Sequence, residues 1–303
     1  MVVRFALGAM VAVVVGGLSM GTTTTIFAQS GPAGPGGIGA PGGPTGASGP
    51  TGPTGPTGPA APTPCTTPAL RLRCPDLVMS APSQLHLDRS TIPGRVLLRA
   101  ASSVNNHGGG PLEIRAQRIG SHAMAVYQAI YDRSGHRHLF RLAATLVFKY
   151  VPGERYAHES VGNFSYWKFE HAAAFQLWSI NGERRAVGLA RVGPKVAYCL
   201  RDLVRSRPSA SSPRLPAYPA CSQDPNASSD VLGTSVGWSD VYPYEYPEQW
   251  IDVTGLRGSF AYVQIADPDS LLMESNKGNN VSETYVALPS GRVLGHRVAV
   301  AAP

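Results

Sequence analysis

Short runs rich in Val, Ile, Tyr and Phe recur along the chain beyond residue 74, each bounded by Gly, Pro, Asn or Asp. Such runs are typical of β-strands. The clearest are "AVYQAIYD" (125–132), "AATLVFKYV" (143–151), "FAYVQIAD" (260–267), "VSETYVAL" (281–288) and "GHRVAVA" (295–301). No long stretch has the period of an amphipathic helix. We therefore expect a mainly β fold, an antiparallel β-sandwich, with short helical insertions near residues 198–235.

Two strand-like runs flank Asn181-Gly182, in "FQLWSI-NG-ERRAVGLARV" (175–192). Asn and Gly adopt positive φ angles more easily than other residues do, and this pair is typical of a two-residue type I′ turn. The pattern therefore predicts a tight β-hairpin centred on this pair.

Glycine opens nine of the ten triplets in residues 31–60, and Ala40 is the single break. Glycine at every third position with abundant Pro is the signature of collagen, because only Gly fits at the axis where three polyproline II chains meet. We expect a collagen-like stalk at 29–61, in triple-helical form and therefore in a homotrimer. The alternative is a disordered Pro/Gly stalk. Residues 62–73 are expected to be a linker.

Arg4 and the apolar run after it have the form of a secretory signal peptide, which we place at residues 1–28 with cleavage after Ala28. The alternative is a retained N-terminal anchor. The short length of the run and the lack of a second apolar run argue against a membrane span. We expect a secreted, extracellular protein with no transmembrane span after signal removal.

The four cysteines fit an oxidising compartment. Cys65 lies near Cys74 in the sequence, and Cys199 lies near Cys221, so two local disulfides are expected. No CxxC pair argues for zinc. The net charge of +7 comes from scattered Arg residues. It indicates mild attraction to anionic surfaces, with no nucleic-acid motif behind it.

Five separated blocks share a further pattern. They are "PDLVMSA" (75–81), "ASSVNNHGGGPLEI" (101–114), "FSYWKFEHAAAFQLW" (164–178), "GPKVAYCLRD" (193–202) and "GWSDVYPYEYPEQWIDVTGLRGSFAYVQIADPDSLLMESNKGNN" (237–280). In this order they resemble the catalytic domain of the lysyl oxidase family, from Pro75 to Val286. The resemblance implies a lysyl oxidase-like domain at 74–303, in which block 193–202 is a strand.

The resemblance implies a copper amine oxidase that builds its own cofactor, lysine tyrosylquinone, from one lysine and one tyrosine. Lys195 matches the cofactor lysine, and Tyr242 matches the cofactor tyrosine. A quinone takes a primary amine as a Schiff base, and a base then removes the α-proton, so the amine is deaminated to an aldehyde. The alternative is that Lys195 is an exposed strand lysine and Tyr242 is one of an aromatic run with Tyr244 and Tyr246.

Copper in this family is bound by an H-x-H-x-H run, whose alternation places three imidazoles on one face of a strand. Block 164–178 aligns with that run through its flanking Trp and Phe residues. The three ligand positions then hold Phe164, Tyr166 and Lys168, and none is histidine. The copper site is therefore expected to be degenerate, with the cation of Lys168 replacing part of the charge of the ion.

Other histidines offer a weaker route to copper. His136 and His138 form an H-x-H, but "DRSGHRHLF" (132–140) is typical of a solvated turn that enters a strand. His158 and His171 flank the altered run and are the remaining candidate ligands. Neither has alternating partners, so we do not expect either of them to restore the site.

A second metal site matches the family better. The resemblance implies a calcium ion held by an Asp-Leu pair in the opening strand and by an acidic, Asn-rich loop near the end of the domain. All the matching positions offer oxygen, as a hard cation requires: Asp76, Leu77 (through its carbonyl), Glu274, Asn276, Asn279 and Asn280. Asn276 replaces the usual Asp, which should weaken binding. The alternative is a polar turn with no ion.

Three functions follow from these observations. The first is a non-catalytic, calcium-stabilised surface or matrix module that binds an extracellular protein or polymer. The second is an active copper and quinone-dependent oxidase of primary amines such as peptidyl lysine. The third is a carbohydrate-binding sandwich that uses the aromatic residues between Tyr242 and Trp250.

Overall fold

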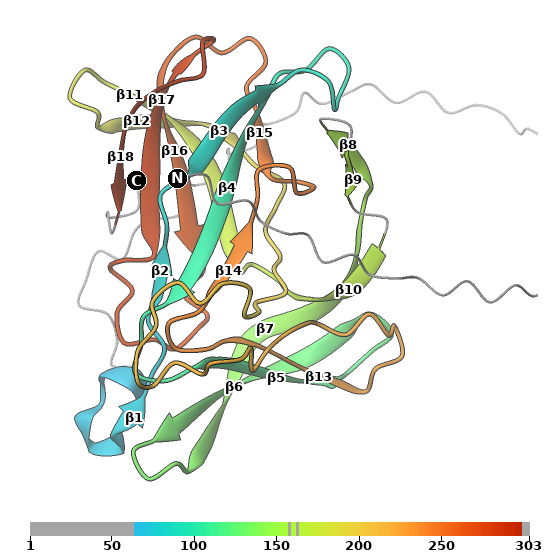
Figure 1. The fold of residues 1–303 in the computed structure, drawn as a ribbon, viewed down its shortest axis with the longest axis vertical. Helices are drawn as coiled ribbons and strands as arrows, with labels where there is room; N and C mark the ends of the chain where they lie inside the picture. Colours follow the sequence, from blue (N-terminus) through green and yellow to red (C-terminus); the bar gives the residue numbers. More distant parts are fainter. Residues whose placement is uncertain (1–63, 157–158, 162–163, 299–303) are drawn as a thin grey trace, which may run out of the picture. The chain divides into compact units, whose positions relative to one another are not determined.

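The computed structural model describes residues 64–156, 159–161 and 164–298 (Figure 1). The predicted signal peptide and collagen-like stalk lie outside these residues. All described residues belong to one compact unit, Pro50–Pro303. The described chain begins with two 3-10 turns and a short strand, η1 (Pro64–Thr66), η2 (Pro68–Leu70) and β1 (Leu72–Arg73).

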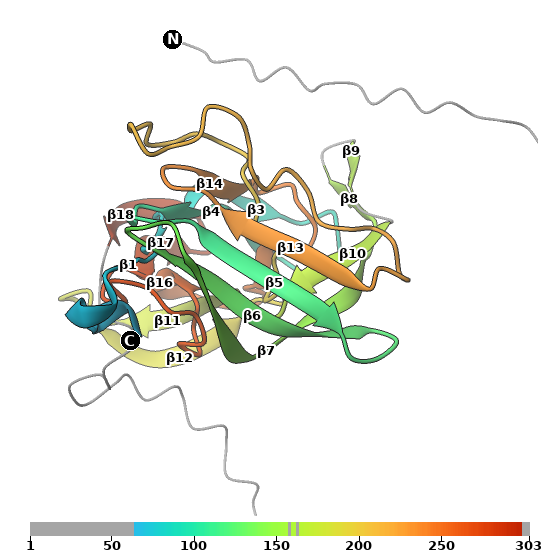
Figure 2. The same ribbon diagram turned by 90° about the horizontal axis from the view of Figure 1, so that it is seen from below.

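The described residues form antiparallel sheets, which confirms the mainly β prediction. The first sheet has the order β10 (Phe164–Phe169), β7 (Arg137–Val151), β6 (Ala123–Asp132), β5 (Leu112–Arg118) and β13 (Ser229–Thr234), with β1 on β6. Figure 2 shows these strands side by side. The second sheet has the order β12 (Ala186–Val192), β11 (Ala173–Ile180), β16 (Gly258–Ala266), β17 (Val281–Leu288) and β18 (Arg292–Val298).

A third sheet is centred on one long strand, β4 (Leu97–Asn106). The strands β14 (Ser239–Tyr242), β15 (Trp250–Asp252), β2 (Leu77–Met79) and β3 (Ser83–Asp88) all pair with it. A separate hairpin consists of β8 (Glu154–Tyr156) and β9 (Glu159–Val161). Because β4 carries the partners of both β2 and β14, it links the start of the domain to the segment that bears Tyr242.

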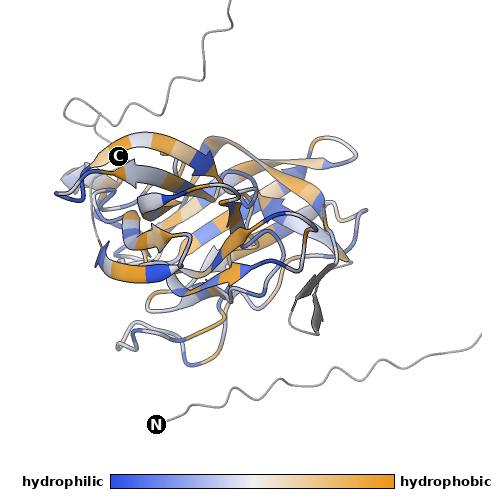
Figure 3. Ribbon diagram, turned by 90° about the horizontal axis from the view of Figure 1, so that it is seen from above, coloured by the Kyte–Doolittle hydropathy of each residue, from blue (hydrophilic) through white to orange (hydrophobic). Residues whose placement is uncertain are grey.

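One hydrophobic core joins the three larger sheets. It receives side chains from β4, β5, β11 and β16, among them Leu98, Ile114, Leu177 and Tyr262. Successive side chains of a strand point to opposite faces, so apolar and polar residues alternate where only one face is buried. Figure 3 shows this alternation along several strands. β17 departs from it, because a smaller cluster that includes Tyr285 covers its second face.

The hairpin of β11 and β12 is present, but its two-residue turn is not. Ile180 pairs with Ala186, so the connection spans residues 181–185. The side-chain oxygen of Asn181 accepts hydrogen bonds from the amides of Glu183 and Arg185, and Arg184 has the positive φ of 60°. The prediction of a type I′ turn was therefore wrong, because Asn181 caps a longer loop and Arg184, rather than Gly182, adopts the left-handed conformation.

Residues 193–228 contain neither a helix nor a strand, only isolated bridges such as Phe169 with Tyr198. The predictions of helical insertions near 198–235 and of a strand at 193–202 were therefore wrong. Five prolines between residues 208 and 225 remove backbone donors that a helix needs. The buried carboxylate of Asp202 instead accepts hydrogen bonds from the amides of Ala217 and Ser235.

Both predicted disulfides are present, Cys65–Cys74 and Cys199–Cys221. The first joins the predicted linker, near its start, to the first residue of the domain. The second closes the irregular segment after β12. Within the described ranges, no helix is long and apolar enough to cross a membrane.

Candidate functional site

The strand β10 carries all three predicted copper-ligand positions, Phe164, Tyr166 and Lys168, on one face. Tyr166 pairs with Lys149 of β7, and Lys168 pairs with Val147. Between them, Trp167 points to the opposite face and is also buried. Because both faces of this strand are covered, the side chain of Lys168 cannot reach solvent and is fully buried.

Lys168 has no hydrogen-bond acceptor among the described residues. Its Nζ atom lies 4.7 Å from the centroid of the Tyr166 ring, within reach of a cation–π interaction. Burial lowers the pKa of Lys168 to about 8, the charge of Glu248 opposes this change, and the charge of Lys149 adds to it. A substantial fraction of this amine is therefore neutral at slightly alkaline pH.

Lys195 is also fully buried, so it is not the exposed strand lysine of the alternative interpretation. Its Nζ atom lies 4.2 Å from the ring centroid of Tyr242, 4.6 Å from that of Tyr246 and 4.7 Å from that of Tyr198. No described residue accepts a hydrogen bond from it. Burial and then the charge of Lys168 hold the pKa of Lys195 well below its usual value.

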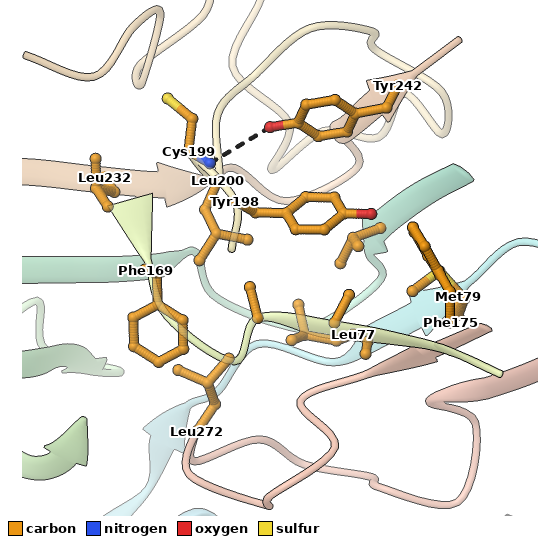
Figure 4. Close-up of a cluster of buried hydrophobic side chains, with 14 of the residues drawn as sticks. Leu77, Met79, Phe169, Phe175, Tyr198, Cys199, Leu200, Leu232, Tyr242 and Leu272 are labelled. Carbon is orange, nitrogen blue, oxygen red and sulfur yellow. Dashed lines mark hydrogen bonds between the residues drawn. The ribbon is translucent and has the colours of Figure 1, made fainter. Parts of the chain in front are cut away.

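Tyr242 ends β14 and lies among other tyrosines. Its hydroxyl oxygen accepts a hydrogen bond from the backbone amide of Cys199 at 3.3 Å (Figure 4). The rings of Tyr198 and Tyr246 meet it edge to face, at centroid distances of 4.6 Å and 4.9 Å. The hydroxyls of Tyr246 and Tyr166 are hydrogen-bonded at 2.7 Å. We call Lys168, Lys195 and these four tyrosines the lysine–tyrosine cluster.

A buried ion pair fixes the loop that carries Tyr246. Arg99 of β4 is fully buried and bonds to Asp88 through Nε at 2.8 Å. The same guanidinium donates to the carbonyl oxygens of Tyr244 and Tyr246. This role of Arg99 could not be predicted from the sequence, because the contacts join segments about 145 residues apart.

The donor set at the copper positions does not fit Cu(II). Phe164 has no ligand atom and stacks on Tyr166 at a centroid distance of 5.5 Å. The Tyr166 hydroxyl already bonds to Tyr246, and Lys168 offers an amine that is protonated at neutral pH. Copper sites of this type need imidazole ligands. Among the described residues, no group of three or more His, Cys, Asp or Glu side chains is placed to hold a metal ion.

The candidate histidines that the structure describes pair with carboxylates outside the cluster. His136 and His138 both face Asp132 at the turn between β6 and β7, with nitrogen to oxygen distances of 3.6 Å and 3.2 Å. His136 lies in the exposed turn and His138 near the start of β7, which confirms the interpretation of a turn that enters a strand. His171 is half exposed and pairs with Asp269 at 3.0 Å. His158 lies outside the described residues.

A pocket of about 220 Å³ opens beside the lysine–tyrosine cluster. Its walls include Phe164, Tyr166, Tyr242, Tyr246, Arg201 and Gln223, together with the disulfide Cys199–Cys221. The buried Asp240 is close enough to Arg201 and Lys195 to feel their charges; burial raises the pKa of Asp240 to about 7, although these charges oppose the change. Sequence reasoning missed Arg201 as a site residue; its place two residues after a disulfide cysteine was the available signal.

Five of the six predicted calcium residues converge. Glu274 accepts hydrogen bonds from the Leu77 amide at 2.9 Å and from the Asn280 side chain at 2.7 Å. The Asn279 side chain donates to Asp76 at 2.9 Å. Asn276, the sixth residue, is exposed and caps the amide of Gly278 in its own loop. β2 and the loop before β17 thus meet where the prediction placed a cation.

The atoms of this site fit a hard cation in one respect and oppose it in another. The side-chain oxygens of Asn279 and Asn280 are buried and have no hydrogen-bond donor in the described part of the chain. However, the Nζ atom of Lys277 lies 2.7 Å from Asp267 and 3.5 Å from Glu274. Burial raises the pKa of Glu274 to about 7. Calcium would therefore have to compete with an internal ammonium and with protons.

Residues 147–296, from within β7 to within β18, match the family model for lysyl oxidase. No curated protein gave a significant match to the chain. The matched residues include both lysines of the lysine–tyrosine cluster, Tyr242 and the loop with Glu274. The match agrees with the resemblance in the separated blocks and with the β-rich fold, so residues 147–296 are similar to the lysyl oxidase domain.

Proposed function

We propose that this protein is a secreted, non-catalytic member of the lysyl oxidase group, a surface or matrix module with a degenerate copper site. The observation that carries the proposal is the position of Lys168. It stands at the third predicted copper ligand, it is buried, and its amine has no acceptor in the described residues. A lysine cation at this place repels a metal ion instead of binding it.

The charges around the cluster also argue against amine substrates. Primary amines are cations at neutral pH. The cluster already holds two lysines, and Lys149 lies near enough to affect the pKa of both. Against them stand Asp240, which is partly protonated at neutral pH, and Glu248, which pairs with Lys149 at 3.5 Å. A further ammonium would enter a site that already has an excess of positive charge.

Secretion is part of the same proposal. The two disulfides fit an oxidising compartment, and the matched family is extracellular. Calcium is the proposed stabilising ion, supported by the two buried amide oxygens without donors. The trimeric collagen-like stalk would display the domain away from its attachment point.

The active copper and quinone-dependent oxidase is the second candidate. One observation favours it: Lys195 and Tyr242, the two positions that the resemblance assigns to the cofactor, are in contact. The carbohydrate-binding sandwich has less support, because Tyr242 is buried and Tyr244, Tyr246 and Trp250 are only partly exposed.

Copper loading and amine oxidation decide between the first two functions. The protein, expressed with copper, should produce no hydrogen peroxide from n-butylamine and show no quinone absorbance. The variant F164H/Y166H/K168H restores alternating imidazoles on β10 and should bind copper. The same variant with Tyr242→Phe serves as the matched control for quinone formation. Tyr242-dependent peroxide from the unaltered protein would overturn the proposal in favour of the oxidase.

A further inference from the structure

We propose that the pocket beside the lysine–tyrosine cluster binds a small aromatic carboxylate, whose carboxylate is received by Arg201 and whose ring lies between aromatic walls. This inference rests on the proposed function, because it assigns a ligand to the site that the degenerate copper positions leave without a metal. The ligand has the opposite charge to an amine substrate.

The size and the walls of the pocket define the body of the ligand. The volume of about 220 Å³ is below the range of roughly 300–1,000 Å³ for sites that hold drug-sized molecules, so one substituted ring is the appropriate size. Phe164 and Tyr166 stack on each other at an interplanar angle of 29°, and Tyr246 bonds to Tyr166. These rings offer a flat apolar wall for an aromatic ligand.

Arg201 defines the charge of the ligand. It is the one charged residue among the described residues that line the pocket. Among all the residues that the structure describes, none forms a hydrogen bond or salt bridge with the Arg201 guanidinium. Arginine has a planar fork of donors that matches a carboxylate with two parallel hydrogen bonds. A guanidinium at an aromatic pocket with its donors unused is therefore suited to a carboxylate ligand.

The backbone holds Arg201 in place before any ligand binds. On one side, the carbonyl of Leu200 accepts a hydrogen bond from the amide of Gly233 at 2.7 Å. On the other side, the amide of Asp202 donates to the carbonyl of Tyr218 at 2.9 Å. The disulfide of Cys199 lies in the pocket wall itself. A fixed backbone reduces the ordering cost of binding.

The two buried lysines add a positive electrostatic potential next to the rings that line the pocket. Lys168 lies over the Tyr166 ring, and Lys195 lies over the rings of Tyr242 and Tyr246, all of which line the pocket. Positive charge this close to the rings that line the pocket favours an anionic ligand and disfavours an ammonium. Asp240 reduces this potential only in part, because burial raises its pKa to about 7.

Isothermal titration calorimetry of the full chain at pH 7 tests the proposal with matched probes. Phenylacetate should bind about tenfold to a hundredfold more tightly than the neutral phenylacetamide, in line with hydrogen bonds to a charged group. Acetate, which lacks the ring, and 2-phenylethylamine, which carries the opposite charge, should show no binding. Equal affinity for phenylacetate and phenylacetamide, or no binding of phenylacetate, would overturn the proposal.

Variants locate the binding in the pocket. Arg201→Met should reduce the affinity for phenylacetate by about tenfold or more. The affinity of Arg201→Lys should lie between those of the parent and Arg201→Met, since lysine keeps the charge but lacks the planar pair of donors. Arg214→Met, at an exposed position of the same segment, is the control and should bind as the parent does. Unchanged affinity in folded Arg201→Met overturns this inference alone, whereas peroxide release from 2-phenylethylamine by the parent overturns the proposed function.

Discussion

The Nζ atom of Lys195 lies 4.2 Å from the centre of the Tyr242 ring, and no hydrogen-bond acceptor in the described chain reaches it. Lys195 comes from the irregular segment after β12, and Tyr242 comes from the end of β14. An enclosed amine of this kind has lost its hydration and is surrounded by aromatic rings, and burial therefore holds the pKa of Lys195 well below its usual value. Its effect on stability can be measured directly.

Lys195→Met should stabilise the folded protein. Methionine fills a similar volume without a charge, and replacement of buried charged groups by apolar ones is often stabilising by about 1–4 kcal/mol. Urea unfolding at pH 7 gives the change. Lys149→Met is the control, since that side chain is partly exposed and pairs with Glu248. A lower free energy of unfolding for Lys195→Met would mean that its contacts with the three rings outweigh the cost of desolvation.

Stability should fall between about pH 4 and pH 7. Burial raises the pKa of Asp240 from 3.8 to about 7 and that of Glu274 from 4.5 to about 7. The folded protein therefore binds more protons than the unfolded chain in this range, and the free energy of unfolding decreases as the pH rises. Asp240 contributes about 4 kcal/mol at most. Asp240→Asn should make this decrease shallower, whereas Asp224→Asn, at an exposed position, should leave it unchanged.

Above pH 8 the direction should reverse. The pKa of Lys168 is lowered to about 8 in the folded state, whereas the unfolded chain holds this proton up to about 10.5. Between these values the unfolded chain binds more protons, so the free energy of unfolding increases with pH. Thermal unfolding from pH 5 to pH 9.5 should show minimal stability near pH 7 to 8. The rise above pH 8 should become smaller in Lys168→Met.

Calcium should raise the melting temperature, because binding to the folded state alone stabilises it by about 2.7 kcal/mol at a hundredfold excess over Kd. Glu274→Ala should remove most of the rise. Lys277→Met should enlarge it, since the ammonium beside Asp267 and Glu274 no longer competes. The exposed Asn276→Ala is the control. If calcium raises the melting temperature of Glu274→Ala as much as that of the parent, any calcium site lies elsewhere.

The collagen-like stalk should determine the oligomeric state. Sedimentation of the secreted protein should give a trimer, and deletion of residues 31–60 should give a monomer. Circular dichroism should show a polyproline-like signal that melts on heating and disappears with the deletion. A parent protein that sediments as a monomer would favour the disordered stalk.

Runs of β-branched and aromatic residues were sufficient to predict several of the strands. β6, β7, β16 and β17 lie where the runs of β-branched and aromatic residues placed them, because side-chain alternation is a local property. The segment 193–228 was not predictable in this way. Long-range contacts, such as those of the Asp202 carboxylate with Ser235 and with the amide of Ala217, hold it in place.

The candidate site was predictable only in part. The alignment with a histidine run placed Tyr166 and Lys168 on one strand, and the structure has that strand as β10. The contact between Lys195 and Tyr242 depends on how separate segments pack, and so does the place of Arg201 in the pocket wall. One-dimensional spacing contains no information about these distances.

The disulfide between Cys199 and Cys221 lies in the wall of the pocket, and the amide of Cys199 also bonds to the Tyr242 hydroxyl. One covalent bond thus supports the guanidinium, the aromatic wall and the hydroxyl of the central tyrosine. If it is reduced, the sheets retain their hydrogen bonds, but the binding surface loses the link between its two sides. If the chain is exported as proposed, formation of this disulfide is the step that would complete the ligand-binding surface.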